Sequence, residues 1–570
     1  LGSGLVNLGL APGQRSFVGI YAANCPEWQI SACGISSQSM VVVPLYDTLG
    51  ADATSYIIKQ AEISTVICDT VDKAKILLSS VEEHGAGSVL RHIIVVYGDV
   101  STLSNNQVRV HSYEDILKLG QSRHHAPLPP NPQDLYIICY TSGTTGNPKG
   151  VMLAHESLIA DVACFHVMVR DYGGSHLVPR PSDCMMSYLP LAHMFEQMMQ
   201  VFFLSYGAKI GFAHGNIRKL NDDMKALRPV FIPAVPRVLN RLTDQIMGAV
   251  RKGGLPAKIL FNLAYFSKLA QVSMGIYRRD TIWDKLLFRR VQQELGGNMM
   301  MMVTGSAPIS GRVLNLCRVA LGCPILEGYG QTECTAGCTF SLPNDMNTAH
   351  VGPPIPACQI KVVDVPDLDY FARDDKGEVC IKGPIVMKGY FKEPEKTRET
   401  IDADGWLHTG DIGLWQPNGS LKIIDRKKHI FKLAQGEYVA PEKIEEVYSR
   451  SEFVISIFVD GISTERFLVA IVMPNERQVL AMAKQEGLLQ GESVDQIYDN
   501  PKVAAAVLER LRKLGKAKKL NSIEQIQALH LTKDHWTVEN GLLTPTMKTK
   551  RPQLRKYYDT VIRNLYANAE

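Results

Sequence analysis

A run of glycine and hydroxyl residues at 141–150 carries the clearest chemical signal in the sequence. It reads Thr-Ser-Gly-Thr-Thr-Gly-Asn-Pro-Lys-Gly and lies between two apolar stretches, 136–140 and 151–153. Glycines let backbone amides approach an anion closely, hydroxyls can donate to phosphate oxygens, and Lys149 adds a positive charge. We interpret the run as a triphosphate-binding loop.

The spacing of this loop differs from that of a Walker A loop. Gly143 and Gly146 are three residues apart, and Lys149 is followed by glycine instead of serine or threonine. A flexible polar linker is the alternative interpretation, but linkers are seldom enclosed between apolar strands. Triphosphate binding is therefore favoured.

Residues 141–150 resemble the signature of the adenylate-forming superfamily, which includes acyl-CoA synthetases, luciferases and peptide-synthetase adenylation domains. Further motifs of that family follow in the same order along nearly the whole chain, at 190–196, 328–333, 409–411 and 425–428. The closest resemblance, to eukaryotic long-chain fatty acyl-CoA synthetases, is in the local sequences at 333–340, 431–443 and 541–548. It implies ligation of a long-chain fatty acid to CoA: the acid and ATP give acyl-AMP and pyrophosphate, and the CoA thiol then displaces AMP.

The residue types suit that reaction. A thiol does not attack a carboxylate directly at neutral pH, and joining the acid to AMP supplies a phosphate leaving group with a second pKa of about 6. The carboxylate must first approach the α-phosphorus of ATP, so the protein has to neutralise and position two anions. The resemblance implies ATP contacts from Thr141, Ser142, Gly143, Thr144, Thr145, Gly146, Lys149, Gly305, Tyr329, Gly330, Thr332, Asp411 and Arg426.

The resemblance also implies individual roles. Glu333, with Thr141, would bind Mg²⁺, which usually takes one or two carboxylates plus phosphate oxygens. Tyr329 would stack on adenine, and a core aromatic is the alternative. Asp411 would accept the ribose hydroxyls, and capping the preceding turn is its alternative. Arg426 would reach ribose or phosphate with its fork of donors.

Lys548 and His193 are catalytic candidates together with Glu333. Lys548 aligns with the adenylation lysine of the family, which bridges the carboxylate and the α-phosphate. The Ser-Gly that usually precedes this lysine reads Thr546-Met547 here, and a solvated basic face is the alternative. His193 would orient the substrate carboxylate by one hydrogen bond, whereas a lone histidine among apolar residues is more often part of a core.

The second step requires the CoA thiol to reach the place of the lysine. Members of the family achieve this by rotating a small C-terminal domain about a hinge. The resemblance implies a hinge at 425–428 with Lys428 at the hinge position, and it assigns Gly436 and Lys432 to the CoA half-reaction. The implied domains are 1–424, which binds ATP and fatty acid and includes a β-rich part at about 350–424, and a mobile α+β domain at 425–570.

The elements that must position these motifs are predicted from hydrophobic periodicity. Near-continuous apolar runs, as in parallel strands buried on both faces, occur at 16–21, 65–68, 93–97, 136–140 and 300–303. Helical spacing between several of them predicts a large α/β body of doubly wound sheets.

The pattern of predicted elements changes after about residue 350. An antiparallel β subdomain is predicted from short strands at 359–363, 377–381 and 421–424 and an Asn-Gly turn at 418–419. A smaller α+β stretch follows from residue 425, in which Pro441 begins a helix with an apolar stripe at Ile444, Val447 and Tyr448.

Composition excludes several other classes. The 570 residues are 45% hydrophobic and carry a net charge of +4, which argues against a disordered chain or a nucleic-acid coat. The twelve cysteines show neither a disulfide framework nor zinc spacing, which favours reduced thiols in a cytosolic compartment. No run reaches the roughly 18 apolar residues that a membrane span needs.

The first residue is leucine and no signal peptide follows, so we expect a soluble fragment whose natural start is missing. Family members are usually held at the endoplasmic reticulum or the outer mitochondrial membrane by an N-terminal apolar segment. The resemblance therefore implies a location on the cytosolic face of one of these membranes. Residues 501–570 carry 14 Lys/Arg against 6 Asp/Glu, a bias that indicates a solvated face, a polyphosphate ligand or an anionic surface.

Two other functions stay open. An adenylating ligase for an aryl or medium-chain acid, or a luciferase-like oxidase, would share the first step. A catalytically silent nucleotide-binding scaffold is a different class, and a set of five intact candidate residues argues against it: Lys149, Glu333, Asp411, Arg426 and Lys548. The acyl chain is least readable, since the apolar stretch 198–206 is a candidate tunnel wall, but helical apolar residues more often belong to a core.

Overall fold

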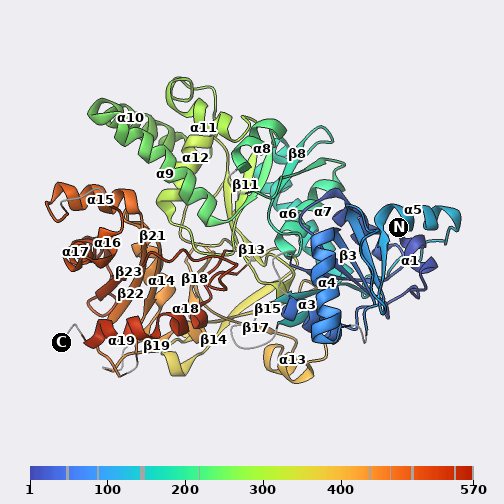
Figure 1. Cartoon of the computed structure of the whole chain (residues 1–570). Helices are drawn as coiled ribbons and strands as arrows, with labels where there is room; N and C mark the ends of the chain where they lie inside the picture. Colours follow the sequence, from blue (N-terminus) through green and yellow to red (C-terminus); the bar gives the residue numbers. More distant parts are fainter. Residues whose placement is uncertain are drawn as a thin grey trace.

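The computed structural model describes residues 1–46, 51–86, 89–141, 148–216, 219–434, 438–462, 464–489, 493–544 and 547–567 (Figure 1). The N-terminal part is built on an eight-stranded sheet with the order β16-β7-β6-β2-β1-β3-β4-β5. Its strands are β1 (Phe17–Tyr21), β2 (Val41–Leu45), β3 (Thr65–Thr70), β4 (His92–Tyr97), β5 (Arg109–Ser112), β6 (Leu135–Thr141), β7 (Lys149–Ala154) and β16 (Gly389–Tyr390).

The apolar runs of the sequence are the parallel centre of this sheet. β1 pairs in parallel with β2 and β3, β3 with β4, and β2 with β6. Four predicted strands, β1, β3, β4 and β6, thus fall where expected, whereas β2 was not predicted. Their side chains are almost wholly buried because helices cover the sheet. These helices are α1 (Gly2–Asn7), α2 (Pro26–Ser36), α3 (Ala51–Gln60), α4 (Val71–His84) and α5 (Tyr113–Ser122).

A second, six-stranded sheet has the order β13-β12-β11-β10-β8-β9 and is parallel except for β13. Its strands are β8 (Cys184–Ser187), β9 (Lys209–Phe212), β10 (Phe231–Ala234), β11 (Met301–Thr304), β12 (Ile325–Tyr329) and β13 (Thr339–Phe340). Its helices are α6 (His155–Gly173), α7 (Met194–Ser205), α8 (Leu220–Leu227), α9 (Pro236–Lys252), α10 (Gly254–Val272), α11 (Arg289–Glu294) and α12 (Gly311–Leu321), with a π-helical turn, η4, at Asp284–Phe288. One core joins both sheets through α6 and α7, which confirms the doubly wound body.

The β-rich stretch forms the predicted antiparallel sheet. Its order is β14-β15-β17-β18, with β14 (Gln359–Val363), β15 (Lys376–Lys382), β17 (Leu407–Trp415) and β18 (Leu421–Arg426). The Asn-Gly turn joins β17 to β18, and Gly419 has φ 79°, a conformation that suits glycine. The short helix α13 (Pro394–Thr400) precedes β17.

The chain beyond β18 has an apolar interior of its own. Two core clusters there contain only residues from Leu433 to Tyr566. The strands are β19 (Phe431–Lys432), β20 (Tyr438–Val439), β21 (Val454–Asp460), β22 (Leu468–Pro474) and β23 (Ile526–Leu531), and the helices α14 (Pro441–Tyr448), α15 (Glu476–Gln485), α16 (Gln496–Asp499), α17 (Pro501–Ala517), α18 (Arg551–Tyr557) and α19 (Asp559–Ala567). As predicted, Pro441 begins α14, and the stripe Ile444, Val447 and Tyr448 is buried.

A small apolar cluster lies where the β-rich part meets the C-terminal part. Val365 and Ile412 contribute to it from one side, and Ile430 and Ala440 from the other. The buried residues of the larger interiors on either side are not part of this cluster.

In the described ranges, none of the helices has the length and apolar character needed to cross a membrane. All twelve cysteines are free thiols.

Candidate active site

The predicted phosphate loop connects two antiparallel strands. β6 ends at Thr141 and β7 begins at Lys149, and these two residues are cross-strand partners. The hairpin therefore holds Thr141 and Lys149 side by side at the mouth of the loop. Five of the predicted ATP contacts, Ser142, Gly143, Thr144, Thr145 and Gly146, lie outside the described residues.

Glu333 is joined to the loop through a tyrosine that the sequence analysis missed. The Tyr390 hydroxyl donates to Glu333 Oε1 at 2.8 Å, and Lys149 Nζ lies 4.7 Å from the centre of the Tyr390 ring. Burial and the Glu333 carboxylate raise the pKa of Tyr390, so the phenol stays protonated and can donate. Tyr390 thus contacts the Glu333 carboxylate through its hydroxyl and the Lys149 ammonium through its ring.

Tyr329, Asp411 and Arg426 form a second cluster. The Tyr329 hydroxyl donates to Asp411 Oδ2 at 2.7 Å, and Arg426 Nε lies 3.2 Å from Asp411 Oδ1. Asp411 and Arg426 are cross-strand partners on β17 and β18, so the sheet register fixes the ion pair. Burial raises the pKa of Asp411, and the Arg426 guanidinium opposes this rise.

Two predicted glycines are required by close backbone approaches around β12. A Cβ on Gly330 would lie 1.9 Å from the Ala336 carbonyl oxygen, and a Cβ on Gly305 would lie 2.9 Å from the Gly328 carbonyl oxygen. Thr332 begins the 3₁₀ turn Thr332–Cys334 that carries Glu333. These residues therefore shape the backbone that presents Tyr329 and Glu333.

Lys548 approaches this site from the C-terminal part of the chain. A tight turn holds it: the Thr544 amide donates to the Lys548 carbonyl at 2.7 Å, and the Lys548 amide donates to Thr544 Oγ1 at 3.0 Å. Met547 in this turn has φ 64°, the left-handed region where the family usually has glycine. Burial and the Arg426 charge lower the pKa of Lys548 to about 8, while Glu442 and Asp411 partly offset the shift.

His193 is the N-cap of α7. Its Nδ1 accepts a hydrogen bond from the Phe195 amide at 3.3 Å, which leaves the proton of the neutral ring on Nε2. Burial lowers the pKa of His193 to about 4, and the positive charge of Lys548 contributes to the shift. The structure therefore brings together a neutral imidazole and a lysine that are far apart in the sequence.

The predicted hinge, 425–428, covers the last two residues of β18 and the start of the turn that follows. Lys428 lies in the 3₁₀ turn Lys427–His429, and burial lowers its pKa with help from the charges of Arg426 and Lys149. The amide of Glu442 donates to Asp425 Oδ2 at 2.9 Å, which ties α14 to the end of β18. Glu442 was not among the predicted residues.

The residues predicted for the CoA half-reaction are only partly described. Lys432 lies in β19, where its backbone pairs with that of Tyr438 in β20. Gly436 lies outside the described residues.

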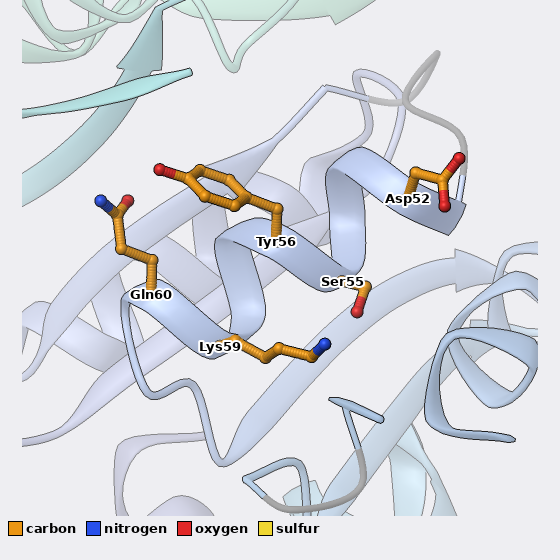
Figure 2. Close-up of a pocket in the computed structure, with 5 residues that line it drawn as sticks. All are labelled: Asp52, Ser55, Tyr56, Lys59 and Gln60. Atoms are coloured by element: carbon orange, nitrogen blue, oxygen red, sulfur yellow. The ribbon is translucent and has the colours of Figure 1, made fainter. Parts of the chain in front are cut away.

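A hollow of about 470 Å³ lies along α3 and is lined by Asp52, Ser55, Tyr56, Lys59 and Gln60 (Figure 2). The Tyr140 hydroxyl donates to Gln60 Oε1 at 2.8 Å, so α3 packs on the strand that leads into the phosphate loop. The stretch of α7 that was a candidate tunnel wall is part of the main hydrophobic core. Its residues Met198, Met199, Phe202 and Phe203 are fully buried there.

Comparisons with known proteins show the family and the fold. A family model described as AMP-binding enzyme matches residues 1–391. Long-chain-fatty-acid–CoA ligase 5 of Rattus norvegicus is 48% identical over 573 residues, which cover 100% of this chain and 83% of that protein. Long-chain-fatty-acid–CoA ligase 6 of Homo sapiens is 48% identical over 571 residues, covering 100% and 81%.

Among solved structures, the A domain of a carboxylic acid reductase from Segniliparus rugosus, in complex with AMP and a co-purified carboxylic acid, is similar in fold. The TM-score is 0.78 at 24% identity, and the match covers 100% of this chain and 85% of that one.

Proposed function

The chain belongs to the AMP-binding enzyme family, and from this premise we propose that it is an ATP-dependent long-chain fatty acid–CoA ligase. Fatty acid and ATP form acyl-AMP and pyrophosphate, and the CoA thiol then displaces AMP to give acyl-CoA. Relatives with 48% identity over the whole chain carry that name, which supports the choice of acid. The observation that carries the adenylation chemistry is the convergence of Lys548, His193 and the Asp411–Arg426 pair.

In the proposed first step, the substrate carboxylate meets the α-phosphate between His193 and Lys548. The Nε2 proton of His193 would orient the carboxylate, since Nδ1 is already used by the Phe195 amide. The Lys548 ammonium would stabilise the negative charge that builds up on the α-phosphate as pyrophosphate leaves. Asp411 would accept the ribose hydroxyls, with Arg426 beside it, and Tyr329 would lie against adenine.

The residues near the loop fit a magnesium ion. Glu333 offers a carboxylate that the Tyr390 hydroxyl orients, and carboxylates are the protein ligands that Mg²⁺ prefers. We assign Glu333 and the Thr141 hydroxyl to hold it. When bound, Mg²⁺ would neutralise negative charge on the phosphates, and the Lys149 ammonium would contribute to this neutralisation.

For the second step we propose that residues 425–570 turn against residues 1–424 about Lys428, so that Gly436 and Lys432 reach the site with CoA. The separate apolar interior of the C-terminal part supports this division, with its boundary at the end of β18. A location on the cytosolic face of the endoplasmic reticulum or outer mitochondrial membrane rests on the resemblance. Fractionation of the full gene product tests it, and recovery only as soluble protein would contradict it.

Pyrophosphate release measured with palmitate, acetate or benzoate, each with and without CoA, tests the proposed function. We expect release with palmitate, acyl-CoA only when CoA is added, and little turnover of the other two acids. A preference for benzoate would favour a ligase for another acid. No release with any acid would favour a nucleotide-binding scaffold.

A further inference from the structure

Helix α10 has an apolar face that is largely exposed in the described part of the chain. Leu255, Ile259, Leu263 and Phe266 are 54% to 69% exposed. At about 100° per residue these four positions fall within an arc of about 80°. The opposite side of α10, with Phe261, Ala264, Lys268 and Val272, is buried against its neighbours α9 and α12.

A helix that is apolar on both sides is normally enclosed on both sides. α10 is enclosed on one side only, and it lies at the outer edge of the molecule (Figure 1). The segment after it adds Met274, Ile276, Ile282 and Leu286, which are 45% to 67% exposed. With Leu260, residues 255–286 thus hold nine of the eighteen exposed large hydrophobic side chains among the described residues, a concentration that indicates a binding surface.

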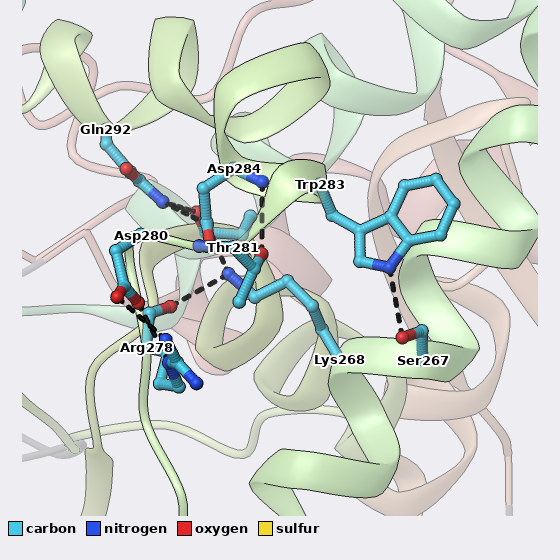
Figure 3. Close-up of polar contacts among 9 residues, drawn as sticks. Ser267, Lys268, Arg278, Asp280, Thr281, Trp283, Asp284 and Gln292 are labelled. Carbon is cyan, nitrogen blue, oxygen red and sulfur yellow. Dashed lines mark hydrogen bonds and ion pairs between the residues drawn. The ribbon is translucent and has the colours of Figure 1, made fainter.

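Polar contacts, among them the buried Lys268–Asp284 pair, hold the two segments together (Figure 3). The Lys268 ammonium on α10 pairs with Asp284 of η4 and donates to the Arg278 carbonyl at 3.0 Å. The Trp283 indole donates to Ser267 Oγ at 3.0 Å. The apolar residues of 274–286 are therefore anchored beside α10.

The charge around this surface is strongly positive. Residues 251–290 contain nine Lys/Arg and two Asp/Glu, a net +7, which leaves −3 on the rest of a chain whose total is +4. α10 itself contains no carboxylate. The exposed basic side chains of this stretch without a carboxylate partner in the described ranges are Lys252, Lys258, Arg279, Lys285, Arg289 and Arg290; Arg279 donates only to the backbone carbonyls of Gly297 and Met299.

We propose that residues 251–290 form an interfacial surface that binds an anionic lipid membrane. Apolar side chains would enter the boundary between headgroups and acyl chains, and the basic rim would contact anionic headgroups. A second copy of the chain fits less well, because a two-fold interface would place the same positive rims against each other. The basic stretch at 501–570 offers no comparable apolar face, since Met547 and Tyr557 are its only large apolar side chains that are exposed among the described residues.

Vesicle flotation tests the proposal without acid, ATP or CoA, so its outcome is independent of the proposed enzymatic function. Two vesicle types are used: phosphatidylcholine alone, and phosphatidylcholine with phosphatidylserine. We expect the protein to float with the anionic vesicles and to be released by high salt. The double variant Leu263→Asp/Phe266→Asp should bind these vesicles at least tenfold more weakly.

Two further variants sharpen the test. Arg289→Glu/Arg290→Glu should weaken binding to the anionic vesicles and leave any binding to neutral ones unchanged. Ile30→Asp/Ile159→Asp, which alters equally exposed apolar residues on α2 and α6, should bind like the unchanged protein. Unaltered elution volume and circular dichroism establish that each variant is folded.

The proposal is overturned if the unchanged protein does not float with anionic vesicles, or if Leu263→Asp/Phe266→Asp binds them as strongly as the unchanged protein does. A dimer in solution that this variant converts to a monomer, with vesicle binding intact, would instead assign the surface to contact between copies.

Discussion

The Lys548 ammonium lies close enough to His193 for its charge to lower the pKa of the imidazole. Lys548 comes from the C-terminal part of the chain, whereas His193 caps a helix of the doubly wound body. The two side chains therefore report directly on how the two parts are arranged. The charges of Arg426 and Asp411 also act on Lys548, which is the arrangement expected for the proposed first half-reaction.

Removal of the Lys548 ammonium should slow adenylation selectively. We expect Lys548→Ala to slow acyl-AMP formation about 10²- to 10³-fold, as for other groups that stabilise a developing anion. Conversion of supplied acyl-AMP to acyl-CoA should continue at nearly the normal rate. Pyrophosphate release and thioester formation measure the two steps separately. Lys550→Ala is the matched control, and an equal loss of both steps in Lys548→Ala would remove the assigned role.

The pH dependence of the first step should follow Lys548. Its pKa is lowered to about 8, so the ammonium is present below that pH and is lost as the pH rises through it. We expect kcat/KM for pyrophosphate release to fall above about pH 8, by up to about tenfold per unit. His193, with a pKa of about 4, stays neutral across this range. The slower variant Lys548→Arg should lack the decline, because a guanidinium keeps its charge; the same decline in that variant would point to another group.

The Tyr390 hydroxyl should matter for magnesium. Tyr390→Phe keeps the ring beside Lys149 but loses the hydrogen bond to Glu333. We expect the Mg²⁺ concentration for half-maximal pyrophosphate release to rise about 10-fold, since groups that orient a metal ligand have effects of this size. Tyr172→Phe, at an exposed tyrosine, provides the comparison. An unchanged magnesium requirement in Tyr390→Phe would argue against Glu333 as a ligand.

The hinge assignment is tested by restricting the backbone. Proline at position 428 fixes φ and should hinder rotation. We expect Lys428→Pro to reduce thioester formation far more than pyrophosphate release. Lys428→Ala separates the effect of the lost ammonium from that of the restricted backbone. Normal overall turnover in Lys428→Pro would exclude this residue as the pivot.

The strands that the sequence predicted well are those buried on both faces, such as β3 and β4, because a short continuous apolar run is typical of a strand covered on both sides. The edge strands β5 and β9 were not predicted, since Arg109–Ser112 and Lys209–Phe212 are partly exposed and have no such run. Within the site, motifs led to Asp411 and Arg426, and the sheet register explains why they meet.

Tyr390 and Glu442 were missed for a physical reason. Each contributes through a partner that is distant in the sequence, Glu333 and Asp425 respectively, and no local pattern encodes such a contact. The exposed face of α10 was hidden in the same way. Apolar periodicity predicts a helix, but only the three-dimensional packing shows which of two apolar sides is covered.

The separate interiors on either side of Lys428 determine the energetic cost of reorienting the smaller part. Among the described residues, the apolar cluster at the boundary has only four buried members, so a turn about this point would not expose the two large hydrophobic cores to water. The other links to be exchanged include polar ones such as the amide of Glu442 on Asp425, for which water offers nearly equivalent partners. Such an exchange of contacts can be reversed in every round of turnover. Separating a large shared hydrophobic core would instead amount to partial unfolding.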